Sequence, residues 1–417
     1  MTRSGKLPSP TTPLASCLNL HDIEKVAQQT LKPKSWAYYH SSADDSLAME
    51  RNRSVYSQIR FRPRALKPVA QVDTSTYILG YKSNYPFFIS PAAMGSACDE
   101  EWIVVGSSGL GRELNLALIA WYHSASSELA HEDGEIALVK GAARAGIPYG
   151  CSTAASVSPL DIAAAGSEDQ TLFFQLYMLK DKQRVEMVLG IAKAIGFKAI
   201  LFTVDAPVPG KRELDLRTGL DENTIVLDES AGQVGEKKSA IAESSQLLTA
   251  NLTWDLIAWI KEKSGLPVVV KGIQSYEDAV QCEKYGAAAI MLSNHGGRQL
   301  DTASTPIETL LEIRRYAPHL LTSSMQIIVD SGIRRGTDAV IALCLGADAV
   351  SLGRPFMYSL CYGEEGVARC AEILGEEIAR AMRLLGVRSV RELDKSLVNT
   401  TKVERLLFAE GNVKLKL

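Results

Sequence analysis

Short apolar runs recur along the chain from residue 86, each followed by a polar or glycine-rich corner and then a helix-length amphipathic stretch. Near-continuous apolar runs are typical of strands buried on both faces of a sheet, and strands separated by helices predict right-handed βαβ units. Eight such runs are present, the strand number of a (β/α)8 TIM barrel, whereas an open doubly wound sheet would need fewer. The predicted strands are residues 87–90, 147–152, 171–177, 199–205, 267–271, 288–293, 326–330 and 349–353.

Helix signals between these runs support the same fold. Ser275, followed by Glu277 and Asp278, predicts a helix that ends before Gly286, because acidic residues suit the first turn and glycine suits the position after the last. A second helix is expected from residue 335 to residue 346. The predicted class is α/β, a TIM barrel with an N-terminal helical extension.

Composition narrows the functions that this fold could serve. Lys and Arg number 45 against 48 Asp and Glu, so the net charge of -3 gives no overall attraction to nucleic acid or an anionic membrane. No apolar run approaches the ~20 residues that cross a bilayer. The 7 cysteines include no Cys-x-x-Cys pair, which predicts neither a disulfide framework nor a metal site. We expect a cytoplasmic protein, with a peroxisomal or mitochondrial location left open.

Polar residues follow the predicted strands at their carboxyl ends. In a TIM barrel these ends share one face, where the active sites of barrel enzymes lie. A functional site is therefore expected at that face. The residues concerned are Ser152, Gln175, Tyr177, Thr203, Asp205, Lys271, Ser293, His295, Asp330 and Arg354.

Residues 293–301 contain the highest concentration of side chains that could take part in catalysis. His295 titrates near neutrality, so it can accept and return a proton, and Arg298 offers a planar fork for a carboxylate. Gly296 and Gly297 let the backbone approach a ligand closely. These features predict proton transfer on an acidic substrate.

The loops after the last two predicted strands are rich in glycine and arginine. They read Asp-Ser-Gly-Ile-Arg-Arg-Gly-Thr-Asp at 330–338 and Gly-Arg-Pro at 353–355. Barrels commonly bind phosphate there, through backbone N–H groups and a helix N-terminus. Arg334 and Arg354 would add charge-assisted bonds, so we expect a phosphate-bearing cofactor at the barrel mouth, without a Rossmann domain.

Taken together, these motifs resemble the FMN-dependent α-hydroxy-acid dehydrogenase/oxidase family. The resemblance covers residues 18–395, leaving residues 1–17 as a flexible arm and 396–417 as a C-terminal tail. The motifs that carry it are Ser-Asn-His-Gly-Gly-Arg-Gln-Leu-Asp at 293–301, Phe-Gln-Leu-Tyr at 174–177, Thr-Val-Asp at 203–205, Val-Lys-Gly at 270–272 and Arg-Arg-Gly-Thr-Asp at 334–338.

The resemblance implies FMN as cofactor and a 2-hydroxy acid as substrate. His295 would take a proton from the substrate, and Asp205 would stabilise the imidazolium, with Tyr177 as a third catalytic residue. The substrate contacts would be Tyr38, Tyr177, Arg212 and Arg298, the two arginines clamping the carboxylate. The residues assigned to FMN are Ala92, Ala93, Ser152, Gln175, Thr203, Lys271 and Ser293 around the ring, and Asp330, Gly332, Arg334, Gly353 and Arg354 around the phosphate.

Two departures from the family pattern stand out. Ala154, followed by Ala155, occupies a wall position where glycolate oxidase carries a bulky aromatic residue, which favours substrates larger than glycolate, such as lactate or a branched or aryl 2-hydroxy acid. Residues 96–129 form an insertion of 34 residues. A retained intron or incorrect gene model, a tolerated insertion, and a lid over the barrel mouth are its three explanations.

The predicted function is FMN-dependent oxidation of a 2-hydroxy acid to the 2-oxo acid. Oxygen is the expected electron acceptor because no haem-binding domain precedes the barrel. The alternatives are a decarboxylating reaction of the lactate 2-monooxygenase type, a Schiff-base aldolase using Lys271, and a catalytically impaired barrel that serves as a binding module. The resemblance also implies a homo-oligomer, expected to be a tetramer.

Overall fold

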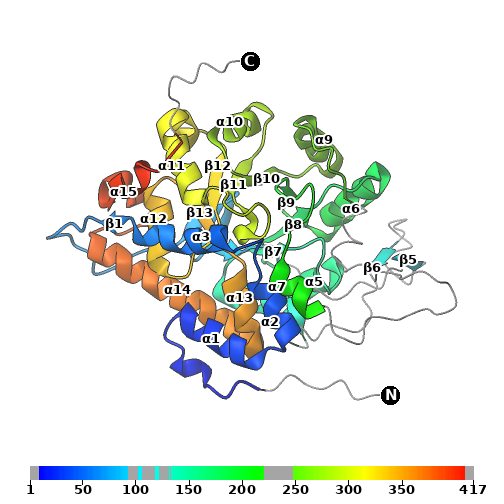
Figure 1. Ribbon diagram of the computed structural model, residues 1–417, viewed down its shortest axis with the longest axis horizontal. Coiled ribbons are helices and arrows are strands. Elements are labelled where there is room, and N and C mark those ends of the chain that lie inside the picture. The colour runs from blue at the N-terminus through cyan, green and yellow to red at the C-terminus, as the bar shows by residue number, and fades with distance from the viewer. Residues whose placement is uncertain are drawn as a thin grey trace.

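The structure, a computed structural model, describes residues 9–92, 102–105, 118–121, 131, 133–219 and 248–408. Eight parallel strands close into a barrel in chain order (Figure 1). Each predicted strand is present within two residues of its expected bounds, which confirms the TIM barrel. The strands are β4 (Phe87–Ile89), β7 (Tyr149–Cys151), β8 (Leu172–Leu176), β9 (Ala199–Thr203), β10 (Val268–Ile273), β11 (Ala289–Leu292), β12 (Gln326–Val329) and β13 (Ala349–Leu352).

Helices cover the outside of the barrel. The start predicted at Ser275 is confirmed, because its side chain accepts a hydrogen bond from the backbone N–H of Asp278. The helices that follow the strands are α4 (Gly134–Ala145), α5 (Pro159–Ala165), α6 (Lys182–Ile195), α7 (Glu213–Gly219), α9 (Asp255–Ser264), α10 (Tyr276–Lys284), α11 (Pro306–Tyr316), α12 (Gly336–Cys344), α13 (Arg354–Ser359) and α14 (Gly363–Leu385).

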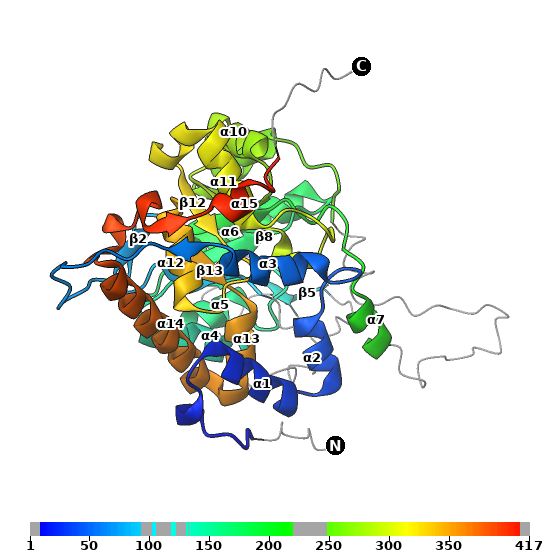
Figure 2. The ribbon, with the colours of Figure 1, turned by 60° about the vertical axis from the view of Figure 1, so that its left-hand side comes forward.

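Within the described residues, three α-helices precede the barrel, in agreement with the expected helical extension: α1 (Leu20–Thr30), α2 (Pro33–His40) and α3 (Leu47–Ser57). Figures 1 and 2 show α1 and α2 beside α13, which follows the last barrel strand. The N-terminal extension therefore lies at the carboxyl end of β13, close to the predicted phosphate loops.

The C-terminal segment returns to this N-terminal part. Strand β14 (Val398–Asn399) pairs antiparallel with β1 (Arg60–Phe61), and α15 (Thr401–Glu404) follows. Val403 is completely buried. The expected tail from residue 396 is thus folded against the protein as far as residue 408.

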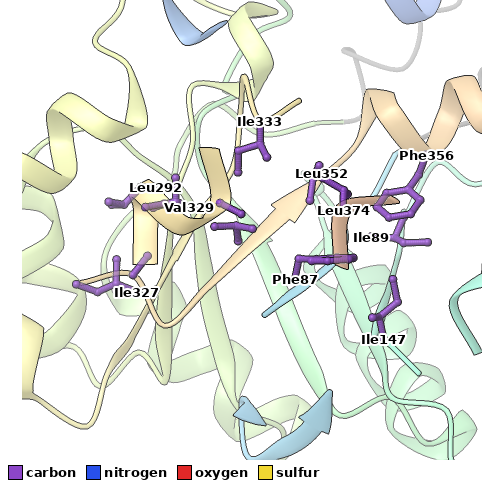
Figure 3. Packing of buried hydrophobic residues seen from close by; sticks show 14 of the residues in the cluster. Phe87, Ile89, Ile147, Leu292, Ile327, Val329, Ile333, Leu352, Phe356 and Leu374 are labelled. Carbon is purple, nitrogen blue, oxygen red and sulfur yellow. The ribbon is translucent and has the colours of Figure 1, made fainter. Parts of the chain in front are cut away.

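Apolar side chains pack in two layers. Residues such as Phe88, Phe173 and Met291 fill the barrel interior, and the hairpin of β2 (Thr76–Ile78) and β3 (Tyr81–Ser83) adds Ile78 to this inner cluster. A larger cluster lies between the strands and the helices. Figure 3 shows part of it, with strand residues close to Phe356 and Leu374. The packed interior leaves the carboxyl face of the barrel as the place for chemistry.

The insertion is described only at β5 (Trp102–Val105) and β6 (Leu118–Trp121), whose backbones pair antiparallel. Its other residues lie outside the described part of the chain. Within the described ranges, six cysteines are all free and buried, and no helix combines the length and apolar character that would span a membrane.

Candidate active site

A histidine–aspartate pair lies at the carboxyl face, with the aspartate buried and the histidine partly exposed. His295 follows β11 in the 3-10 turn His295–Gly297, and Asp205 follows β9. The Nδ1 atom of His295 lies 2.9 Å from Oδ1 of Asp205, whose side chain is fully buried. The Nε2 atom of His295 lies 3.5 Å from the hydroxyl of Tyr177. Asp205 thus orients the imidazole, and Nε2 is the nitrogen left for a substrate.

The surroundings favour the neutral form of His295 and the ionised form of Asp205. Burial lowers the pKa of His295 to about 4, although Asp205 opposes the shift. Burial alone would raise the pKa of Asp205, but His295 and Lys271 outweigh it and hold that pKa below its ordinary value. A neutral imidazole beside an ionised carboxylate is the arrangement of a general base ready to accept a proton.

Lys271, on β10, lies on the other side of Asp205. Its Nζ atom is 3.6 Å from Oδ2 of Asp205, and among the described residues neither atom has a hydrogen-bond partner. Burial would lower the pKa of Lys271, but Asp205 and Asp330 outweigh burial and raise it. A Schiff-base lysine needs a neutral amine, so this environment disfavours the aldolase alternative.

Polar side chains form a row across the neighbouring strand ends. Ser152 donates to Oε1 of Gln175 at 3.0 Å, and Nε2 of Gln175 lies 3.0 Å from the Thr203 hydroxyl oxygen, to which it donates. Farther around the barrel, Ser293 donates to Asp330 at 2.9 Å. The row places donors and acceptors along the face where the resemblance expects the flavin ring.

Two arginines concentrate positive charge beside His295. The Arg298 guanidinium lies 5.1 Å from the centre of the Tyr38 ring and donates to the Tyr38 and Ser41 carbonyls at 2.8 and 3.2 Å. Burial, and then the charge of Arg212, lower the pKa of Arg298 to about 9. The buried Nε of Arg212 has no hydrogen-bond partner among the described residues. A substrate carboxylate would relieve this repulsion and satisfy the free donor.

Of the two predicted phosphate arginines, Arg354 lies close to Arg298, because both donate to the Ser41 carbonyl. Arg354 donates to the carbonyls of Tyr39, Gly296 and Ser41 at 2.9–3.0 Å. A guanidinium has five N–H donors, so two of them remain for a ligand. Arg334 is buried, with Nε 3.5 Å from the Glu24 carboxylate.

Two glycines of the predicted phosphate loops have different surroundings. Gly332 has φ +81°, and a Cβ there would lie 1.9 Å from the Asn52 carbonyl oxygen. Gly353 immediately precedes α13, and a Cβ there would meet only Ser90, at 3.8 Å. The free space at Gly353, beside the two arginines, suits a phosphate, whereas Gly332 is required by its close contact with Asn52.

These residues fit FMN, the cofactor that the resemblance implies. Among the described residues the ammonium of Lys271 lacks a hydrogen-bond acceptor, the row from Ser152 to Thr203 supplies polar contacts, and Arg334 and Arg354 supply positive charge. Ala92 lies in the loop after β4 and is partly buried, whereas Ala93 lies outside the described residues. The remaining predicted site residues are brought together at the carboxyl face or, for Tyr38, on α2 beside it.

Sequence reasoning missed several residues that hold this site in place. Gln299 donates to the carbonyls of Asp205 and Val208 at 3.0 and 2.9 Å and accepts from the Gly210 N–H at 3.1 Å. It therefore joins the loops after β9 and β11. Gln299 and Asn294 lie within the 293–301 motif, so their position in this motif could have identified them as supporting residues. Nothing local in the sequence marked Asn52.

Comparisons with known proteins bear on the family and the fold. A family model described as FMN-dependent dehydrogenase matches residues 27–105 and 108–400. The chain is 36% identical to an L-lactate dehydrogenase (cytochrome) of Wickerhamomyces anomalus, over 94% of this chain but 63% of that protein. It is 33% identical to an L-lactate oxidase of Nostoc sp., over 93% of this chain and 100% of that protein. A solved structure of a mutant flavocytochrome b2 with benzoylformate matches with a TM-score of 0.78 and 34% identity, covering 96% of this chain and 91% of that one.

Proposed function

Because the chain belongs to the family of FMN-dependent dehydrogenases, we propose that it oxidises a 2-hydroxy acid to the corresponding 2-oxo acid. The observation that carries the proposal is the neutral His295 held 2.9 Å from Asp205 and flanked by Arg298. A base beside a carboxylate-binding cation is what the oxidation of a hydroxy acid requires.

The side chains divide the work of this reaction. Arg212 and Arg298 bind the substrate carboxylate and so direct its C2 atom toward His295. His295 Nε2 accepts the proton that the substrate releases, and Asp205 stabilises the resulting imidazolium. FMN, when bound, would supply the acceptor for the two electrons and the second proton that the substrate loses. Tyr177, 3.5 Å from Nε2, is placed to hydrogen-bond the substrate oxygen.

For the substrate class we propose 2-hydroxy acids larger than glycolate. Ala154 is exposed at the barrel mouth, and its neighbour Ala155 is buried, so neither side chain fills the space that an aromatic residue would. The flavocytochrome b2 mutant structure contains benzoylformate, a 2-oxo acid with a phenyl group. Lactate and aryl hydroxy acids such as mandelate are therefore the first substrates to test.

For the electron acceptor we propose molecular oxygen, as the name of the L-lactate oxidase states for that relative. Oxygen would take up two electrons and two protons to give hydrogen peroxide. Cytochrome is the competing acceptor, since it is named for the fungal relative.

One set of assays tests these proposals. Purified protein is incubated with glycolate, L-lactate or mandelate under air, and oxygen uptake, peroxide and organic products are measured. Formation of the 2-oxo acid with peroxide supports the oxidase, while an acid shortened by one carbon indicates the decarboxylating reaction. Turnover that needs added cytochrome c makes the protein a cytochrome-linked dehydrogenase. Absence of any product with every acceptor contradicts the proposed function.

We also propose a homotetramer, on the family resemblance alone. Light scattering of the purified protein measures its mass in solution. A mass of one 45.3-kDa chain would contradict the tetramer.

A further inference from the structure

His295 lies in a backbone turn that needs support from outside. Its φ is +56°, and the next two residues, Gly296 and Gly297, have φ of +68° and +77°. Glycine adopts this left-handed region easily, but a histidine there brings its Cβ close to the following carbonyl. Such a conformation persists only where surrounding contacts fix it. Contacts from other segments of the chain must therefore hold His295 in place.

The strongest candidate is a pair of buried amides. Nδ2 of Asn52 donates to Oδ1 of Asn294 at 2.7 Å, and Nδ2 of Asn294 donates to Oδ1 of Asn52 at 2.8 Å. Each residue is 1% exposed. Oδ1 of Asn294 also accepts from the Gly297 N–H at 3.2 Å, which closes the turn that contains His295. Asn52 therefore fixes the side chain on which the turn is built.

Asn52 belongs to a helix that is itself tied to the same loop. The Asp301 carboxylate accepts from the backbone N–H groups of Leu47 and Ala48, at 3.2 and 2.7 Å, at the start of α3. A Cβ on Gly297 would lie 2.6 Å from the Met49 nitrogen, so the helix and the turn are in direct contact. Helix α3 contacts the His295–Gly297 turn and α11, and Figures 1 and 2 show it lying across the barrel.

We propose that Asn52 is a positioning residue for the reaction. Through Asn294 it holds the 293–297 turn so that His295 keeps its hydrogen bond to Asp205. The proposal rests on the proposed function. Arg298, on the same loop, has its own supports in the Tyr38 and Ser41 carbonyls. Loss of the amide pair should therefore impair proton transfer more than substrate binding.

Steady-state kinetics of the FMN-loaded Asn52→Ala and Asn294→Ala variants and the double variant test this role. A small misplacement of a catalytic group can reduce the rate by up to about 10²-fold, so we expect kcat to fall by roughly 10- to 10²-fold. KM should stay near the wild-type value. Because Asn52 acts through Asn294, the double variant should lose little more than Asn294→Ala alone.

Val55→Ala is the matched control for general destabilisation. Val55 is 3% exposed on the same helix, so its truncation weakens packing without touching the amide pair. The variant should lower the unfolding temperature and leave kcat unchanged well below that temperature. Wild-type kcat in Asn52→Ala, or equal losses in Asn52→Ala and Val55→Ala, would overturn the proposal. Inactivity of the wild-type protein would instead count against the proposed function.

Discussion

At the scale of single residues, the site depends on the desolvation of His295, which keeps its imidazole neutral. Desolvation disfavours the imidazolium, while the ionised Asp205 keeps a partner ready for it once a proton arrives. The balance leaves a neutral base whose accepting nitrogen is defined by the other nitrogen's hydrogen bond. Loss of either member should therefore affect turnover more than cofactor binding.

Replacing the base gives the first prediction. In His295→Gln the amide retains hydrogen-bonding capacity toward Asp205 but cannot accept a proton. Because general-base catalysis contributes about 10²–10⁴-fold, kcat should fall by that factor. The visible spectrum should still show bound flavin. Turnover equal to that of the wild-type protein would remove His295 from the mechanism.

The pH dependence of kcat/KM follows from the lowered pKa of His295. The base works in its neutral form, so activity is present above the pKa and is lost as the pH falls through it. With that pKa at about 4, kcat/KM should remain near its maximum well below the ordinary histidine value of about 6.5.

The substrate carboxyl group titrates in the same acidic range, so two substrates of different acidity separate the contributions. If the acidic limb of the kcat/KM profile shifts with the acidity of the substrate, it reports titration of the substrate carboxyl group. A fixed limb at or above pH ~6.5 would contradict the environment described for His295.

The Arg298→Lys variant tests the carboxylate clamp. A lysine keeps the charge but cannot make two parallel hydrogen bonds, so KM should rise by roughly 10- to 10²-fold, the equivalent of one charge-assisted bond. Arg51→Lys, an exposed residue of α3, is the control and should behave as wild type. An unchanged KM in Arg298→Lys would show that the carboxylate binds elsewhere.

At the scale of secondary structure, the barrel could be read from the sequence because its signals are local. Each strand is a continuous apolar run, and Ser275 and Gly286 mark helix ends within a few residues of the chain. The support of the site could not be read this way. Asn52 meets Asn294 across 242 positions, and β1 pairs with β14 from the far end of the chain. Such contacts leave no periodic pattern in either segment.

Helix packing provides a prediction at this scale. Gly141 lies where α4 packs against α14, and a Cβ there would lie 2.5 Å from the Cβ of Val367. Gly141→Ala should therefore lower the free energy of unfolding by about 1–3 kcal/mol through overpacking.

Gly190, within α6, is the matched control. It has no heavy atom within 4 Å of an added Cβ, so Gly190→Ala should raise the free energy of unfolding by about 0.4–1 kcal/mol. Thermal unfolding of the two variants measures both effects. Changes of the same sign would show that the packing is wrongly described at one of these sites.

At the scale of the whole molecule, the N-terminal helices complete a barrel whose chemistry lies at one face. Strand ends supply His295, Asp205 and Lys271, while α2 and α3 supply Tyr38 and the amide that supports the base. The balanced charge of the chain, -3 overall, contrasts with the cluster of largely desolvated arginines at this face. Positive charge is concentrated where a phosphate and a carboxylate are expected, which is why the site is suited to small anions.

The most direct test of this account is to mix the purified, flavin-containing protein with a 2-hydroxy acid in the absence of oxygen and follow the flavin absorption. The account predicts that the visible absorption bleaches and that one 2-oxo acid forms for each flavin, with L-lactate or mandelate more effective than glycolate. A colourless protein, or a yellow one whose spectrum no 2-hydroxy acid changes, would contradict it.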